Sequence, residues 1–230
     1  MRAQLTARVL NTAVPNVARI YDFMLGGKDN FAADRDAAER IMRAIPHSAL
    51  ACRQNRDFLG RAVRALADRG VRQFLDIGSG LPTRDNVHEI AQRAAPAART
   101  AYVDYDRVVV THARALLEKG SAGVLVIEGD LRDPGKSFGE ARGLIDFSEA
   151  VAVLLFAVLH FLTDADDPQA VVASLAGHLA PGSAVAISHL TGEGTDPGKS
   201  LAAQRVYQSA SAPPSPAHGR KSPGSSTTWT

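Results

Sequence analysis

The chain has 230 residues, 45% of them hydrophobic, which is enough to fill the core of one domain or slightly more. Its 26 Lys and Arg nearly balance its 24 Asp and Glu, so the composition shows no general signature of a nucleic-acid partner. The single cysteine, Cys52, excludes an internal disulfide, and the seven histidines show no ligand spacing, so we predict no metal site. Because no apolar run matches a membrane span or a signal peptide, we expect no membrane partner and a cytoplasmic location.

Residues 1–70 predict a helical extension. Apolar residues recur at helical spacing over residues 17–24, 34–42 and 53–69. Five arginines decorate the third helix, but Asp57 and Asp68 interleave with them. Such a mixture is typical of a solvated helix face rather than a nucleic-acid surface.

A glycine pair, Gly26 and Gly27, ends the first predicted helix and leads into a charged loop. One interpretation is a simple helix stop. The other is a lid that offers Tyr21, Asp22, Lys28 and Asn30 to a ligand. The residues themselves leave both interpretations open.

From residue 72, short apolar runs alternate with helical patterns. The predicted strands are Arg72–Ile77, Thr100–Val103, Val124–Ile127, Ala150–Phe156 and Ser183–Ser188. This alternation predicts an α/β fold with a doubly wound, mostly parallel sheet of the Rossmann-like type. We therefore expect an extension over 1–70, a Rossmann-like cofactor-binding domain over 71–208 and a disordered tail, rich in Ser, Pro, Gly and Thr, over 209–230.

A glycine-containing turn, Asp76-Ile-Gly78-Ser79-Gly80, follows the first predicted strand. Glycine permits a tight turn and lets the backbone approach a ligand closely. In open α/β sheets the ligand lies outside the carboxyl ends of the strands. The turn alone is equally compatible with a purely structural role.

Acidic residues lie at the ends of three predicted strands. Asp104 follows Gly80 by 24 residues, close to the spacing of an acid that accepts hydrogen bonds from ribose hydroxyls. Asp130 ends the third strand, where a carboxylate can accept from an adenine amino group. Asp76 can fix the turn or meet a cationic group. Purely structural caps remain the alternative.

The chain resembles known methyltransferases in several motifs. Class I S-adenosylmethionine-dependent methyltransferases carry motifs similar to Asp76-Ile-Gly78-Ser-Gly80, Tyr102-Val-Asp104-Tyr-Asp106, Glu128-Gly129-Asp130 and Leu179-Ala-Pro181-Gly182. Residues 18–31, 81–89 and 159–161 resemble, more narrowly, an actinobacterial family of such enzymes that was once catalogued as a domain of unknown function. The resemblance covers about residues 10–208.

This resemblance implies S-adenosylmethionine as the cofactor. It implies that Gly78 and Gly80 line the methionine side, that Asp104 binds the ribose and that Asp130 and Leu131 contact adenine. The full predicted cofactor set is Asp76, Gly78, Ser79, Gly80, Asp104, Tyr105, Asp130 and Leu131, with Tyr21, Lys28 and Asn30 from the lid.

The chain departs from the family pattern in two places. Pro82 replaces the third glycine of the turn, and Thr83 breaks the Gly-x-Gly-x-x-Gly pattern, which disfavours a nicotinamide enzyme. A fold of this type normally adds a sixth strand and an antiparallel seventh, which we expect to be missing here. A frameshifted end is one hypothesis for this difference.

The predicted function is methyl transfer from S-adenosylmethionine to an unidentified small-molecule acceptor. His160, after the fourth strand, is the candidate general base, although it is equally well explained as a histidine bonded to backbone. Methyl transfer can also proceed by in-line positioning alone. The alternative function is a non-catalytic protein that binds a nucleoside cofactor, and a nicotinamide oxidoreductase ranks third.

Overall fold

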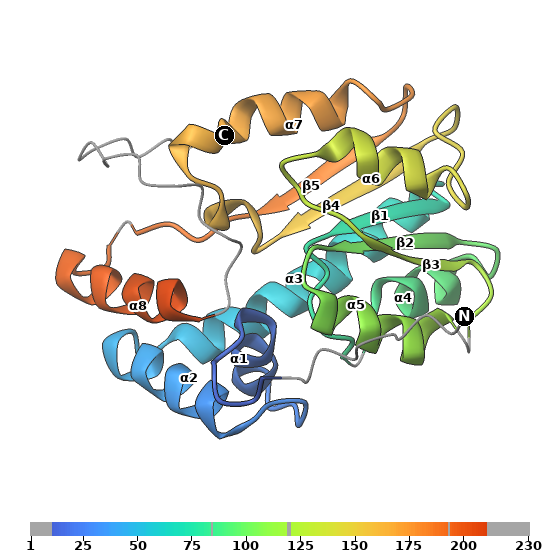
Figure 1. Cartoon of the computed structure of the whole chain (residues 1–230). Coiled ribbons are helices and arrows are strands. Elements are labelled where there is room, and N and C mark those ends of the chain that lie inside the picture. The colour runs from blue at the N-terminus through green and yellow to red at the C-terminus, as the bar shows by residue number, and fades with distance from the viewer. Residues whose placement is uncertain (1–10, 84, 119–120, 193, 211–230) are drawn as a thin grey trace, which may run out of the picture.

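The computed structural model describes residues 11–83, 85–118, 121–192 and 194–210. Its centre is a five-stranded sheet in the order β3-β2-β1-β4-β5, with every neighbouring pair parallel (Figure 1). The strands are β1 (Gln73–Ile77), β2 (Arg99–Asp104), β3 (Val124–Glu128), β4 (Val151–Phe156) and β5 (Ala184–Ser188). The predicted doubly wound parallel sheet is confirmed.

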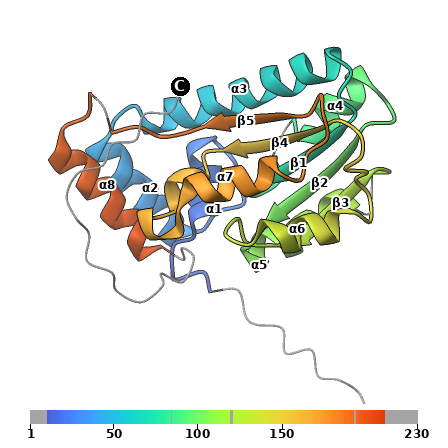
Figure 2. The same cartoon turned by 90° about the horizontal axis from the view of Figure 1, so that it is seen from above.

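The central strands are covered on both faces. Every residue of β1 and of β4 is buried, as expected for parallel strands with helices above and below. Helices α3 (Ser48–Asp68), α4 (Val87–Ala94) and α5 (Arg107–Ala113) cover one face, with a π-helical turn over Arg114–Glu118. Helices α6 (Pro134–Ala141) and α7 (Pro168–Ala176) cover the other, as Figures 1 and 2 show.

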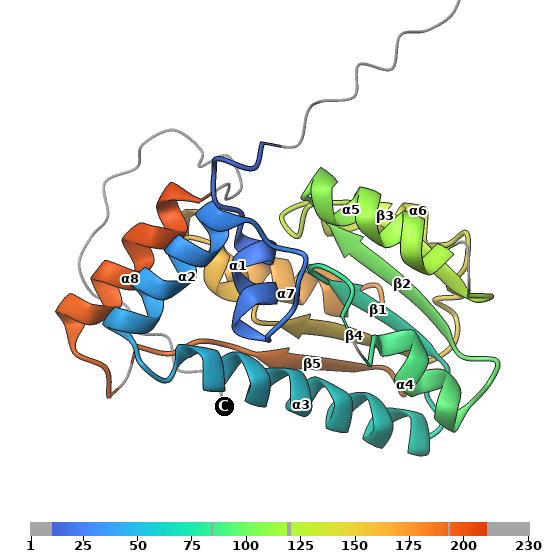
Figure 3. The same ribbon diagram turned by 90° about the horizontal axis from the view of Figure 1, so that it is seen from below.

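A third layer of packing joins the two ends of the described chain. Helices α1 (Val17–Met24) and α2 (Ala32–Ala44) pack with α8 (Pro197–Ser209) around Ile20, Met24, Ile41 and Ala203. Figure 3 shows α1 beyond the end of the sheet toward which β1 and β4 run. Because ligands bind at the carboxyl ends of parallel strands, α1 is placed over the predicted site.

Helix α6 is not predicted in the sequence analysis. Gly135 and Gly139 lower the intrinsic helix propensity of this segment, so its sequence does not indicate a helix. The start signals are nevertheless present: Pro134 occupies the first turn, and the carboxylate of Asp133 accepts a hydrogen bond from the backbone N–H of Lys136 at 3.3 Å. Packing of Phe138 against the sheet stabilises the helix despite its glycines.

The predicted disordered tail lies mostly in residues 211–230, outside the described residues. No described strand pairs with the outer edge of β5. Among the described helices, none combines the length and apolar character needed to cross a membrane.

Candidate functional site

The glycine turn after β1 is held against β2. The backbone N–H groups of Gly78 and Ser79 both donate to the carbonyl of Val103, at 2.8 and 3.3 Å. Gly78 and Gly80 have φ values of +74° and +66°, a region that favours glycine. A Cβ on Gly78 would lie 2.4 Å from Cγ2 of Val158, whereas one on Gly80 would meet nothing within 4 Å. Gly78 is therefore required by packing, and Gly80 leaves open space beside the backbone.

Asp104 links this turn to the loop after β2. One carboxylate oxygen accepts from the backbone N–H of Gly80 and the other from that of Asp106, both at 2.9 Å. Burial raises the pKa of Asp104 to about 6, although these backbone hydrogen bonds act to lower it. Each carboxylate oxygen has further lone pairs, so the side chain remains able to accept hydrogen bonds from a ligand.

Asp76 is a buried carboxylate beside the turn. It stands opposite Tyr102 in the sheet register and is only 5% exposed. Burial raises the pKa of Asp76 to about 7; the positive charge of Arg56 opposes this rise and the charge of Asp104 adds to it. Among the described residues, no side chain or backbone group donates a hydrogen bond to its carboxylate. Such a group is costly unless a ligand supplies the missing donor.

Asp76 and Arg56 line one pocket between α3, the sheet and the loop after β1. Its lining consists of Arg56, Asp76, Ser79, Gly80, Leu81, Pro82, Asn86, Val87, Tyr102, Ala113 and Leu117. The sequence predicts a solvated face for the arginines of α3. That holds for the exposed Arg61 and Arg64 but is wrong for Arg56, which is half-buried. The spacing of Arg56 from Leu59 and Val63, three and seven residues on, is the signal that places it on the inward face.

The loop after β3 presents a different environment. Arg132 binds both carboxylate oxygens of Asp130, with its Nη2 2.6 Å from Oδ2 and its Nε 2.9 Å from Oδ1. Burial alone would raise the pKa of Asp130, but the hydrogen bonds from Arg132 outweigh it and lower that pKa. Leu131 packs into the core, while Tyr105 is 37% exposed. Tyr105 therefore presents the open aromatic surface here, and Asp130 is already paired.

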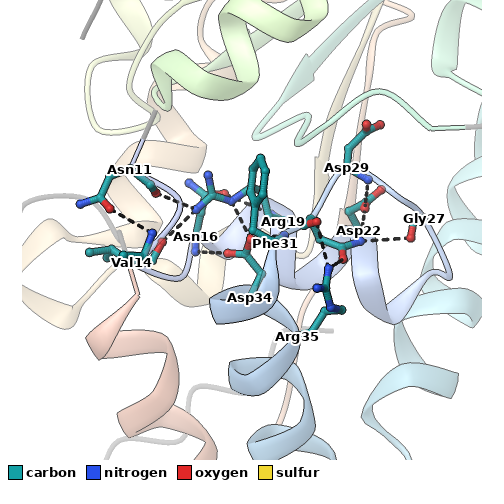
Figure 4. A network of polar contacts seen from close by, with 12 residues as sticks. Asn11, Val14, Asn16, Arg19, Asp22, Gly27, Asp29, Phe31, Asp34 and Arg35 are labelled. Atoms are coloured by element: carbon teal, nitrogen blue, oxygen red, sulfur yellow. Dashed lines mark hydrogen bonds and ion pairs between the residues drawn. The ribbon is translucent and has the colours of Figure 1, made fainter. Parts of the chain in front are cut away.

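The predicted lid residues lie around the loop after α1. The carboxylate of Asp22 accepts from the backbone N–H of Asp29 and from Nδ2 of Asn30, both at 2.9 Å (Figure 4). A Cβ on Gly27 would lie 1.9 Å from Oδ1 of Asp22, so only glycine fits there. Lys28 is exposed. Asn30 thus helps to fold the loop, whereas Lys28 lies on its surface.

Tyr21 faces α3 rather than solvent. Its hydroxyl donates to the carbonyl of Cys52 at 3.1 Å and accepts from Nδ2 of Asn55 at 3.0 Å. The pKa of this hydroxyl is raised, mainly because Tyr21 is buried. The structure brings the glycine turn, Asp76 and Asp104 together, whereas the hydroxyl of Tyr21 is already used between two helices.

The segment before the loop is tied to both α2 and α5. Nε of Arg19 lies 2.9 Å from the carboxylate of Asp34, and both side chains are buried (Figure 4). The side-chain amide of Asn16 donates to Asp106, the N-cap of α5. His112 on α5 approaches Asp29 at 3.8 Å. The loop after α1 is therefore anchored over the carboxyl end of β2.

His160 lies where β4 leaves the sheet, in a short helical turn over Leu159–Phe161. Its ring centroid is 4.5 Å from that of Phe161 and 5.9 Å from that of His189, which follows β5. Nδ1 of His160 is buried with no hydrogen-bond partner among the described residues. Burial, together with the charge of His189, lowers the pKa of His160 to about 4, so the ring is neutral near neutral pH.

Ala157, between β4 and this turn, has a φ of +51°, which is strained for a residue other than glycine. Its N–H donates to Oγ of Ser188 at 2.9 Å, so the ends of β4 and β5 are held together. Since Val158 also packs on Gly78, the His160 segment adjoins the glycine turn. In the described part of the chain, no group of three or more His, Cys, Asp or Glu is arranged to hold a metal ion.

A parallel sheet with a glycine turn after β1 and an acid at the end of β2 is the arrangement of a Rossmann-like cofactor-binding protein. The chain belongs to the S-adenosyl methyltransferase family, whose model matches residues 3–220. S-adenosylmethionine is accordingly its cofactor, as the motif resemblance predicts.

Two solved structures support the same assignment. A protein from Thermobifida fusca that is assigned as a methyltransferase shares 40% identity, with a TM-score of 0.82, over 91% of this chain and 79% of its own. A DUF574 family protein from Streptomyces avermitilis shares 39% identity, with a TM-score of 0.81, over 88% of this chain and 78% of its own. No curated protein matches the chain.

Proposed function

We propose that this methyltransferase acts on a small-molecule acceptor and that the turn after β1 and the end of β2 hold the cofactor. The observation that carries the proposal is the position of Asp104, whose carboxylate joins Gly80 to the loop after β2. A carboxylate with free lone pairs at a strand end suits the vicinal hydroxyls of a ribose. The open space beside Gly80 and the unpartnered carboxylate of Asp76 fit the rest of the group.

In this proposal each strand end has its own task. Gly78, Ser79 and Gly80 line the amino-acid side of the cofactor, and Asp76 accepts hydrogen bonds from its ammonium group. Tyr105 provides an apolar surface for the adenine. Asp130 and Leu131 border that surface, and because Arg132 already pairs with Asp130, adenine would share the carboxylate with it. When bound, S-adenosylmethionine supplies an electrophilic methyl group.

The acceptor side is proposed at the ends of β4 and β5. The neutral ring of His160 has a buried nitrogen without a partner and stands beside the strained Ala157. We assign it as the group that takes the proton from the acceptor as the new bond to the methyl carbon forms. A weak base suffices, because the acceptor proton becomes strongly acidic as that bond forms.

A small acceptor is favoured over a macromolecule by two features. The charge is nearly balanced, so no basic surface for a polyanion is expected. The segment that carries Asn16 and Asp29 is also tied across the end of β2, where it would restrict access to the site. We propose that this segment, with Tyr21, Lys28 and Asn30, forms the lid of the site.

The test is calorimetric titration of the purified chain with S-adenosylmethionine, S-adenosylhomocysteine and NAD. We expect micromolar binding of the first two and no response to NAD. Transfer of a labelled methyl group is then measured to an ultrafiltrate of actinobacterial extract and, separately, to its macromolecular fraction. Label in the macromolecules alone would overturn the small-molecule proposal, and binding without any transfer would favour a non-catalytic binding protein.

A further inference from the structure

The strongest unassigned feature of the site is Arg56. We propose that Arg56 binds the carboxylate of the amino-acid end of S-adenosylmethionine, and that Arg56 and Asp76 together make the site specific for a zwitterionic α-amino acid. The inference rests on the proposed function and goes beyond it by naming which chemical group the cofactor must carry.

The first argument is placement. Arg56, on α3, and Asp76, on β1, line the same pocket as Ser79 and Gly80 of the glycine turn. Nη2 of Arg56 donates to the carbonyl of Asp85 at 3.2 Å, in the loop that follows the turn. Asp85 is itself held by Arg93 at 2.7 Å. The guanidinium is therefore held by the loop that follows the glycine turn.

The second argument is the arrangement of charge. Arg56 acts electrostatically on Asp76, on Tyr102 and on Tyr21, where its charge lowers the pKa in each case. Arg56 donates a hydrogen bond to the carbonyl of Asp85, and it acts on Asp76 through its charge. An acidic group and a positive group thus border one pocket.

The third argument is the chemistry of the ligand. An α-amino acid carries an ammonium and a carboxylate on the same carbon atom. Asp76 lacks a hydrogen-bond donor, and an ammonium supplies three. The planar guanidinium of arginine matches a carboxylate and binds it with charge-assisted hydrogen bonds. A solvated arginine would neither line the pocket nor lie next to an unpartnered acid.

The experiment compares two cofactors that differ only in this carboxylate: S-adenosylmethionine and decarboxylated S-adenosylmethionine. The wild-type chain and the variants Arg56→Met and Arg56→Lys are titrated with both, with Arg64→Met, an exposed arginine on the same helix, as the matched control. We expect Arg56→Met to bind S-adenosylmethionine at least ~10-fold more weakly while its affinity for the decarboxylated compound is unchanged. Arg56→Lys should retain part of the wild-type preference for S-adenosylmethionine over the decarboxylated compound. Arg64→Met should retain all of that preference.

The outcomes separate this inference from the proposed function. If Arg56→Met lost affinity for both compounds equally, or for neither, the carboxylate assignment would be overturned while cofactor binding by the wild type stood. A folded wild-type chain that binds neither compound would overturn both. If Arg56→Met does not fold, Arg56→Lys decides the question. The measured quantity is then the ratio of its affinities for S-adenosylmethionine and the decarboxylated compound. A lysine variant that binds both compounds more weakly but keeps the wild-type ratio would count against the inference.

Discussion

The carboxylate of Asp104 accepts a hydrogen bond from the backbone N–H of Gly80 at 2.9 Å, across 24 residues of sequence. This bond joins the turn after β1 to the end of β2. It holds the two loops together at the edge of the sheet where we propose that the cofactor binds.

The first prediction concerns this carboxylate. Asp104→Ala removes the proposed ribose acceptor and the bond to Gly80, so we expect the affinity for S-adenosylhomocysteine to fall by at least ~100-fold, as for the loss of hydrogen bonds to a charged group. Glu128→Gln is the matched control, since Glu128 stands opposite Asp104 in the register but has an exposed side chain. Calorimetry measures both. Unchanged binding by the alanine variant would refute the site assignment.

The second prediction concerns Asp76 and stability. Its folded-state pKa of about 7 exceeds the ordinary value of 3.8, so the native state holds this proton more tightly than the unfolded state does. The free energy of unfolding therefore decreases as pH rises from about 4 to about 7. Asp76→Asn removes the ionisable carboxyl and with it this decrease in the free energy of unfolding. Thermal denaturation should show the variant more stable than the wild type at about pH 8, with the difference vanishing near about pH 4.

The same variant should lose cofactor binding. Arg56, Asp104 and Tyr102 are the titratable neighbours that face Asp76. Since an ammonium binds only the ionised carboxylate, wild-type affinity should weaken as pH falls below about 7. A more stable variant that still binds S-adenosylhomocysteine with the wild-type pH profile would argue against a role for Asp76 in binding.

The third prediction concerns the loop after α1. A Cβ at position 27 would overlap the carboxylate of Asp22, so Gly27→Ala should destabilise the chain by about 1–3 kcal/mol. Gly139→Ala, on the exposed face of α6 with nothing within 4 Å of the added carbon, should instead stabilise it by about 0.5–1 kcal/mol. Urea denaturation distinguishes the two. Equal effects in both variants would contradict the close packing of Asp22.

The fourth prediction concerns His160. We expect His160→Gln to lower the rate of methyl transfer by about 100-fold while the affinity for S-adenosylhomocysteine stays the same. Because the pKa of His160 is lowered to about 4, its ring stays neutral over the pH range 6 to 8, and the wild-type rate should show no loss from its protonation there. His189→Gln, its exposed neighbour, serves as the comparison. Full activity in His160→Gln would exclude His160 as the general base.

By itself the sequence determined the parallel sheet, the glycine turn and the spacing of Asp104, because these depend on local periodicity and on the order of the strands. The cap of α4 is equally local, because the backbone N–H of Asn86 donates to Glu89, three residues on, at 2.7 Å. These features arise from residues near one another in the chain, so a pattern search finds them.

Only the tertiary structure decided which polar residues share an environment. Arg56 and Asp76 are brought to one pocket by the packing of α3 on the sheet, and Tyr21 is turned toward Asn55 by the same helix. Helix α6 forms against its own glycine content because Phe138 is buried. Burial and contact between distant segments depend on how the layers pack. A local sequence pattern does not specify that packing.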